Sequence, residues 1–181
     1  DTFSLASDCL QECFRVHPDV REELEDQLIQ GLESENADLF KLAANVKLSR
    51  RLKSLLRIDD GTAIDNRYIT CAEYQLFIDE QRELEKYHQP DHWNGYRFPP
   101  GEATQPIKGV RASDAQAFCQ WISLRTGQAY RLPSSQEAQE YPSSNSDIAA
   151  WAETAHETIL LVGVSKKCRD TWRSVLQASF D

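Results

Sequence analysis

Cysteines are the residues of this sequence with the greatest capacity for chemistry, and there are five of them: Cys9, Cys13, Cys71, Cys119 and Cys168. An odd number without any CxxC pair is typical of reduced thiols and not of a disulfide framework. Cys9 and Cys13 would share one side of a helix, but no second pair of ligands lies nearby, so we expect them to be small buried residues. Cys168 stands among two lysines and an arginine, cations that lower the pKa of a thiol and favour a reactive thiolate.

The histidines offer little support for catalysis or metal binding. There are four: His17, His88, His92 and His156. None lies close enough to Cys168 in the sequence to be identified as its base. His88 and His92 flank Pro90, which prevents them from sharing a helix face. We therefore predict no metal ion and no cofactor.

Aromatic residues and arginine dominate binding hot spots, and two stretches of the chain concentrate them. The first is the proline-rich segment 88–105, predicted to be an ordered surface loop, and the second is the tail. The candidate ligand-binding residues, which we expect to be exposed, are Trp93, Asn94, Tyr96 and Arg97 in the loop, with Trp151, His156 and Trp172 in the tail. The alternative interpretation is a loop packed by its own rings, and both interpretations stay open.

Helices are predicted over the first third of the chain, residues 1–58. Apolar residues recur at intervals of three and four within 5–16, 19–32 and 37–56, and polar or proline-containing residues separate these stretches. The most basic part, Lys47–Arg57, is predicted to be an amphipathic helix with its charges on a solvated face. This N-terminal helical segment could be a small bundle, or an arm that docks on a partner or mediates oligomerisation.

An α+β domain is predicted for residues 59–181, because the composition shifts after the turn signal at 59–61. We expect a strand over 66–70, a helix over 71–86 with Leu84 in its core, and a helix over 115–126 capped by Ser113 and Asp114 and ended by Gly127. A brief helix is expected after Ser134 or Ser135, and a buried strand over 159–164.

The overall charge excludes several classes of partner. Twenty Lys and Arg face twenty-nine Asp and Glu, a formal charge of −9 that repels phosphate backbones and anionic membranes, so we expect no nucleic acid and no membrane as partners. No apolar run approaches the ~20 residues that cross a bilayer. Reduced cysteines fit a cytoplasmic protein. Because the chain begins at Asp1 and contains no methionine, we expect it to be part of a longer protein.

Two stretches follow the signatures of a known family. The first, YITCAEY at 68–74 with Phe77, is similar to V-T-x-x-E-Y-x-x-F. The second combines PIKGV at 106–110, DAQAFCQW at 114–121 and TGQAYRLP at 126–133 in the family's order with near-matching spacing. The chain thus resembles the sulfatase-modifying factor (formylglycine-generating enzyme) family over about residues 66–141. The resemblance implies a C-type-lectin-like fold for residues 59–181, with Phe118, Cys119 and Trp121 as scaffold residues and Arg131 able to clamp a carboxylate or carbonyls.

The sequence departs from this family where the chemistry requires particular residues. Family enzymes oxidise a substrate cysteine through two closely spaced cysteines near the end of the domain, which hold copper. Only Cys168 lies in that region, and the histidines lack the three-ligand set of the related iron-dependent enzymes. The tryptophan that follows R-L-P in relatives is also missing from 134–142. We therefore predict that this chain is not an enzyme.

The predicted function is a noncatalytic ligand-binding or protein-interaction module, a sensor on a C-type-lectin-like scaffold. Its context would be a larger bacterial signalling or defence protein, or a variable protein of the kind produced by diversity-generating retroelements, whose scaffold is similar. The ligand, a protein or a small molecule, stays open. The alternative is a formylglycine-generating oxidoreductase acting on a cysteine substrate, which would need Cys168 and a further partner.

Overall fold

The computed structural model describes residues 18–143, 149–155 and 157–161. Six residues singled out above lie outside these ranges: Cys9, Cys13, His17, His156, Cys168 and Trp172. The helix expected over 5–16 also lies outside them, as does the end of the strand expected over 159–164. The described chain divides into two compact units, one made of residues 18–54 with 69–110 and the other of residues 55–68 with 111–161.

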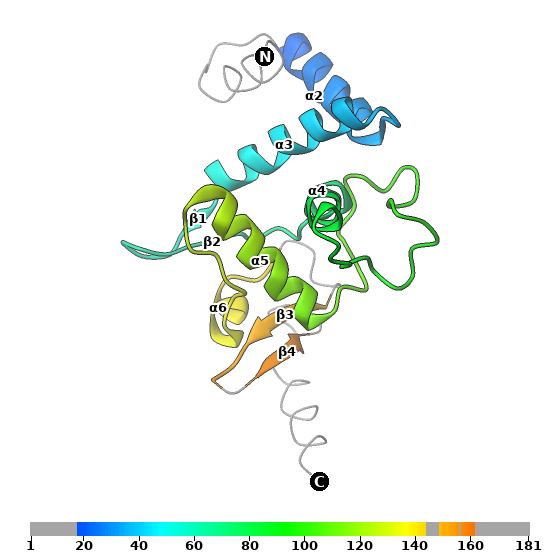
Figure 1. Cartoon of the computed structure of the whole chain (residues 1–181). Coiled ribbons are helices and arrows are strands. Elements are labelled where there is room, and N and C mark those ends of the chain that lie inside the picture. Colours follow the sequence, from blue (N-terminus) through cyan, green and yellow to red (C-terminus); the bar gives the residue numbers. More distant parts are fainter. Residues whose placement is uncertain (1–17, 144–148, 156, 162–181) are drawn as a thin grey trace. The chain divides into compact units, whose positions relative to one another are not determined.

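Three helices and a long loop make up the first unit (Figure 1). The helices α2 (Pro18–Glu33) and α3 (Ala37–Lys53) form an antiparallel helical hairpin, and α4 (Cys71–Glu83) packs on α3. The hairpin closes tightly because Gly31 has no side chain, and a Cβ there would lie 2.8 Å from the Cβ of Ala43. The helices expected over 19–32, 37–56 and 71–86 are thus confirmed, with ends that differ by at most three residues.

Helix α4 forms the core of this unit, because its first eight residues, 71–78, are all buried. The rings of Tyr74 and Phe77 lie 5.3 Å apart between centroids, and Leu76 is also buried. Removing such side chains from water contributes roughly 1.5–3 kcal/mol each. The stretch that carries the first family signature is therefore scaffold.

Short strands and two helices make up the second unit. Its hairpins pair β1 (Leu56–Arg57) with β2 (Ala63–Ile64), and β3 (Ala150–Glu153) with β4 (Thr158–Leu161), both antiparallel. Between them in the sequence lie α5 (Ala112–Thr126) and α6 (Ser135–Glu140). The mixture of helix and strand agrees with the expected α+β class.

The burial of residues in the second unit agrees with the scaffold role predicted for the second family signature. Phe118 and Trp121 of α5 are buried with ring centroids 5.3 Å apart, and Cys119 is half-buried. Gly127 ends α5 in the left-handed conformation at φ 72°, as expected. Ser134 caps α6 in a capping box, so the choice between the two serines is settled.

Three local expectations are wrong. Residues 66–70 do not form a strand, and Thr70 alone makes an isolated bridge, to Pro106. Ser113 and Asp114 do not cap α5, because the helix begins earlier and its N-cap is Arg111, which makes no side-chain cap hydrogen bond. Leu84 is exposed and not in the core, because α4 ends one residue before it.

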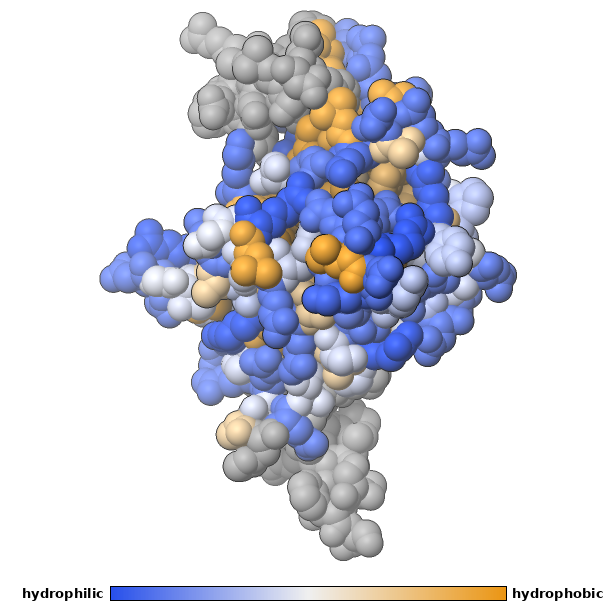
Figure 2. All heavy atoms as spheres, in the orientation of Figure 1, coloured by the Kyte–Doolittle hydropathy of each residue, from blue (hydrophilic) through white to orange (hydrophobic). Residues whose placement is uncertain are grey.

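The two compact units are discontinuous in the sequence, and the domain boundary expected near residue 58 stays a prediction. Helices α2 and α3 belong with α4 because α3 packs against it, whereas residues 55–68 group with 111–161. Figure 2 shows hydrophobic residues gathered over the α2–α3 hairpin. Val20 and Ile29 of α2 and Leu39 of α3 are exposed. The docking-arm interpretation stays a prediction. Within the described residues, no helix is long and apolar enough to span a membrane.

Candidate functional site

The aromatic loop, residues 88–105, follows α4 in the sequence and contains no helix or strand. Its irregular backbone is pinned from inside by buried rings, since Trp93 and Phe98 pack edge to face with centroids 6.3 Å apart. Phe98 in turn contacts Phe40 of α3, with centroids 6.0 Å apart. The loop is therefore packed partly by its own rings and partly by the helical hairpin.

Arg97 attaches the loop to the end of α2. Its guanidinium donates hydrogen bonds to the carbonyl oxygens of Ser34 at 2.6 Å and Leu32 at 3.1 Å. The same guanidinium lies over the rings of Phe40 and Phe98, 4.7 and 5.1 Å from their centroids. A cation at the C-terminus of a helix satisfies orphan carbonyls and complements the helix dipole.

Glu33, the last residue of α2, also binds the loop. Its two carboxylate oxygens accept hydrogen bonds from the backbone N–H groups of Gly101 and Ala103, each at 2.9 Å. From α4, the Gln75 side chain donates to the Tyr96 carbonyl at 2.9 Å and accepts from the Phe98 N–H at 3.3 Å. Hydrogen bonds from three helical positions therefore fix one loop, which is how a rigid scaffold positions a binding segment.

The candidate residues of the loop separate into two groups. Trp93 is only 5% exposed, so the exposure expected of it is wrong: its ring fills the loop's interior. Arg97 is half-buried and engaged with α2 and the two phenyl rings. Asn94 and Tyr96 are exposed, as expected. In the second unit, Trp151 is half-buried on β3. A ligand-binding role of these residues stays a prediction.

Residues around the end of α4 contact the exposed part of the loop, and the sequence pattern did not indicate them. The Arg82 guanidinium lies 5.3 Å from the centroid of the Tyr96 ring. Leu84 and Tyr87, just beyond it, are 62% and 70% exposed, and Tyr96 is 68% exposed. A helix end before Leu84 would have predicted the exposure of these residues. No glycine marks that end in the sequence, because Glu85 occupies the left-handed position at φ 59°.

Glycine at position 85 is expected to stabilise the protein. Glu85 closes the helix end with its N–H on the Arg82 carbonyl, and the next N–H, of Lys86, bonds the Gln81 carbonyl. A non-glycine residue in this conformation costs about 1 kcal/mol. Glu85→Gly should therefore raise the free energy of unfolding by about that amount, as measured by urea denaturation. Glu83→Gly, at the last residue of α4 where φ is not positive, is the control and should not raise it.

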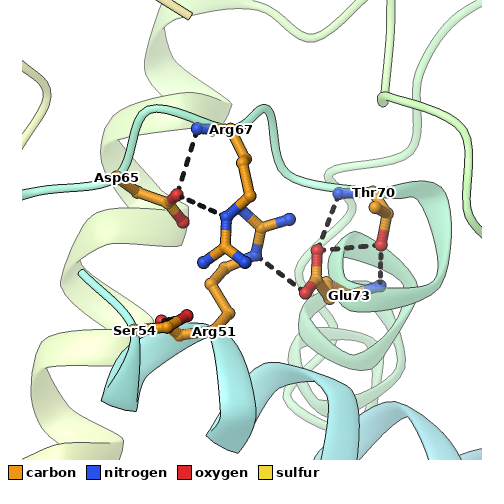
Figure 3. Close-up of polar contacts among 6 residues, drawn as sticks. All are labelled: Arg51, Ser54, Asp65, Arg67, Thr70 and Glu73. Atoms are coloured by element: carbon orange, nitrogen blue, oxygen red, sulfur yellow. Dashed lines mark hydrogen bonds and ion pairs between the residues drawn. The ribbon is translucent and has the colours of Figure 1, made fainter. Parts of the chain in front are cut away.

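Polar groups at the start of α4 form a buried ion pair (Figure 3). Arg51 of α3 donates from Nε to Oε1 of Glu73 at 2.8 Å, and the two side chains are 7% and 0% exposed. The second oxygen of Glu73 accepts from the backbone N–H and the hydroxyl of Thr70, both at 2.8 Å. Arg51 therefore does not lie on the solvated face expected for the basic helix, because it has a buried carboxylate as its partner.

Two cysteine thiols lie in the described chain, and burial makes both poor nucleophiles. Burial raises the pKa of Cys71 to about 11, and the charge of Glu102 adds to the effect. Burial likewise raises the pKa of Cys119 to about 11. At pH 7.5 roughly one such thiol in three thousand is ionised. Copper of the family's kind needs a pair of thiolates, so these two residues do not fit it.

His88 and His92 do not belong to a metal-binding cluster of described residues. Among the described residues, no group of three or more His, Cys, Asp or Glu could hold a metal ion. The His92 ring lies against the backbone of Gly109, where a Cβ would come 2.6 Å from Nδ1. His88 instead contacts the ring of Phe77, with centroids 4.8 Å apart. These two histidines are therefore packing residues in the geometry observed.

Arg131 clamps a carboxylate, as expected. Its two terminal nitrogens donate to the two oxygens of Glu137, both at 2.7 Å, and the Ser134 N–H donates to the same carboxylate. These hydrogen bonds, above all those from Arg131, lower the pKa of Glu137 to about 2. The pair joins the R-L-P segment to the capping box of α6, so it orders the scaffold.

Acid is expected to remove the contribution of this pair. A carboxylate with a depressed pKa stabilises the fold above its ordinary pKa near 4.5, and the stabilisation is lost as pH falls toward 2. Because Arg131 is half exposed, Glu137→Gln should cost on the order of 1 kcal/mol at pH 7. Urea midpoints of the parent and Glu137→Gln should therefore converge between pH 4.5 and pH 2. A constant difference across that range would contradict the assignment.

Comparison with known proteins gives one match. The family model of the sulfatase-modifying factor enzyme 1-like domain matches residues 44–158, which is more than half of the chain. The match includes both signature stretches, the aromatic loop and the C-terminal half of α3. It implies the C-type-lectin-like fold. No curated protein and no solved structure gives a significant match.

Proposed function

Since the chain belongs to the sulfatase-modifying factor family, we propose that it is a noncatalytic binding module whose binding surface is centred on Asn94 and Tyr96 of the aromatic loop. The observation that carries this proposal is the loop's attachment. Gln75, Arg97 and Glu33 fix the backbone from Tyr96 onward. Gln89 donates to the carbonyls of Trp93 and Gly95, the residues on either side of Asn94. A surface ordered before binding loses less entropy when the ligand arrives.

The state of the thiols supports the absence of catalysis. Cys71 and Cys119 occupy scaffold positions, and the raised pKa of each keeps it protonated at neutral pH. The alternative, a cysteine-oxidising enzyme, would therefore depend on Cys168. The same proposal extends to the context of the module. The module would be a sensor within a larger bacterial signalling or defence protein in the cytoplasm, or a variable protein of the retroelement type.

Thiol chemistry and oxygen uptake test the noncatalytic half of the proposal. With iodoacetamide at pH 7.5, Cys71 and Cys119 of the native protein should stay unmodified while denatured protein reacts fully, as read by peptide mass spectrometry. Reduced protein given Cu(I) and a cysteine-containing peptide should consume oxygen no faster than its Cys168→Ser variant. Copper-dependent turnover that requires Cys168 would instead favour the oxidoreductase.

A peptide-display selection tests the binding half. Phage selected on the full chain are counter-screened on the double variant Asn94→Ala/Tyr96→Ala, and on Leu124→Ala as a control. Leu124 is exposed on α5, in the other unit. Selected peptides should lose binding to the loop variant by tenfold or more, and keep it with the control. Peptides that bind all three proteins equally would exclude a site on the loop.

A further inference from the structure

Three large side chains just after α4 and in the aromatic loop are exposed, and we name them the edge patch: Leu84, Tyr87 and Tyr96. Two contacts connect the two segments that carry them. Arg82 lies over the Tyr96 ring, and the Gln89 side chain donates to the carbonyls of Trp93 and Gly95. Exposed apolar groups gathered in this way are typical of an interaction surface.

The charge around the edge patch is negative. Residues 79–96 contain five carboxylates and two cations, and of those cations Arg82 is paired with Asp79 and stacked on Tyr96. Glu83 and Glu85 are exposed and flank Leu84 on both sides. Negative charge next to exposed aromatic rings attracts cations, both by direct pairing and by cation–π contacts.

Backbone strain at Glu85 points to the same edge. The left-handed conformation of Glu85 changes the direction of the chain after α4. Leu84 precedes it and Tyr87 follows it, and both are exposed. A glycine would make that turn with less strain, so the turn itself gives no reason for a glutamate at this position. Strained backbone positions cluster at functional sites and ligand clamps.

We propose that the edge patch binds a basic peptide segment of a partner protein, in which Lys or Arg alternates with an apolar residue. The apolar residue packs on Leu84 and Tyr87, and the cations lie against Glu83, Glu85 and the ring of Tyr96. This inference rests on the proposed function, because it names the partner of the surface that contains Tyr96. An acidic partner would be repelled by the same glutamates.

A pair of synthetic peptides tests the proposal by NMR titration of the full ¹⁵N-labelled chain. One peptide alternates Lys and Leu, and the other alternates Glu and Leu at the same length. The Lys-Leu peptide should shift resonances of residues 82–96, and the Glu-Leu peptide should shift none of them. Tyr87→Ala/Tyr96→Ala should lower the affinity for the Lys-Leu peptide about tenfold. Glu83→Gln/Glu85→Gln should lower it about threefold to fivefold.

Neutralising a distant acidic pair provides the matched control. Glu22→Gln/Asp26→Asn changes two exposed acids of α2 and should leave the affinity unchanged. Equal losses from both acidic variants would overturn the proposal, because they would show attraction to the total charge alone. Self-association that disappears in Tyr87→Ala/Tyr96→Ala would overturn it in favour of a second copy of this chain.

The display selection separates failure of this inference from failure of the proposed function. Peptides that need Asn94 and Tyr96 but carry no excess of Lys and Arg would contradict the basic partner and leave the binding module standing. A selection that yields no peptide dependent on Asn94 and Tyr96 would contradict the module itself.

Discussion

Arg51→Met is expected to lower the free energy of unfolding by about 3–5 kcal/mol, because it leaves the Glu73 carboxylate buried without its cation. Glu73 is fully buried, and Arg51 is its partner from α3 at 2.8 Å. The two remaining hydrogen bonds, from Thr70, cannot replace the positive charge. Urea denaturation of the full chain, followed by circular dichroism, measures the loss.

Arg50→Met is the control, since Arg50 of the same helix pairs with Glu25 of α2, whose side chain is 48% exposed. That change should cost less than about 1 kcal/mol. If both variants lose the same free energy of unfolding, burial of the Arg51–Glu73 pair makes it no more important to stability than the Arg50–Glu25 pair. The double variant Arg51→Met/Glu73→Gln should recover much of the loss, because it leaves no buried charge and the amide oxygen still accepts from Thr70.

Local elements were predictable because their determinants are neighbours in the sequence. Ser134 and Glu137 stand three residues apart and form the capping box of α6, and Gly127 follows the last periodic residue of α5. The end of α4 could not be predicted in the same way. Glu85 adopts a conformation that favours glycine, so the sequence there continues to look helical.

Long-range pairing is the information that periodicity lacks. Arg51 stands in the most basic stretch of the chain, which by itself indicates a solvated face, and its carboxylate partner lies 22 residues away. Arg97 has the composition of a binding hot spot, yet its guanidinium is committed to carbonyls more than 60 residues earlier. For the four loop candidates, the sequence therefore predicted an ordered loop but could not separate the exposed Asn94 and Tyr96 from the two packing residues.

Arg97→Met is expected to release the aromatic loop and to lower the free energy of unfolding by about 2–4 kcal/mol. The variant removes two charge-assisted hydrogen bonds to the end of α2 and the cation between the rings of Phe40 and Phe98. Arg97→Lys should recover less than half of the loss, since an ammonium group cannot bond both carbonyls in a fork while stacking. Denaturation in urea measures both variants.

Hydrogen exchange distinguishes release of the loop from a general loss of stability. The N–H groups of Gly101 and Ala103 bond to Glu33, so their protection should fall most in Arg97→Met, while amides within α5 keep theirs. Arg82→Met removes a cation stacked on an exposed ring and should change the stability by less than about 1 kcal/mol. If Arg97→Met opens the loop, peptides selected on the parent chain should lose affinity for it although Asn94 and Tyr96 are intact. Unchanged affinity with an opened loop would show that the ordered loop is not what the ligand recognises.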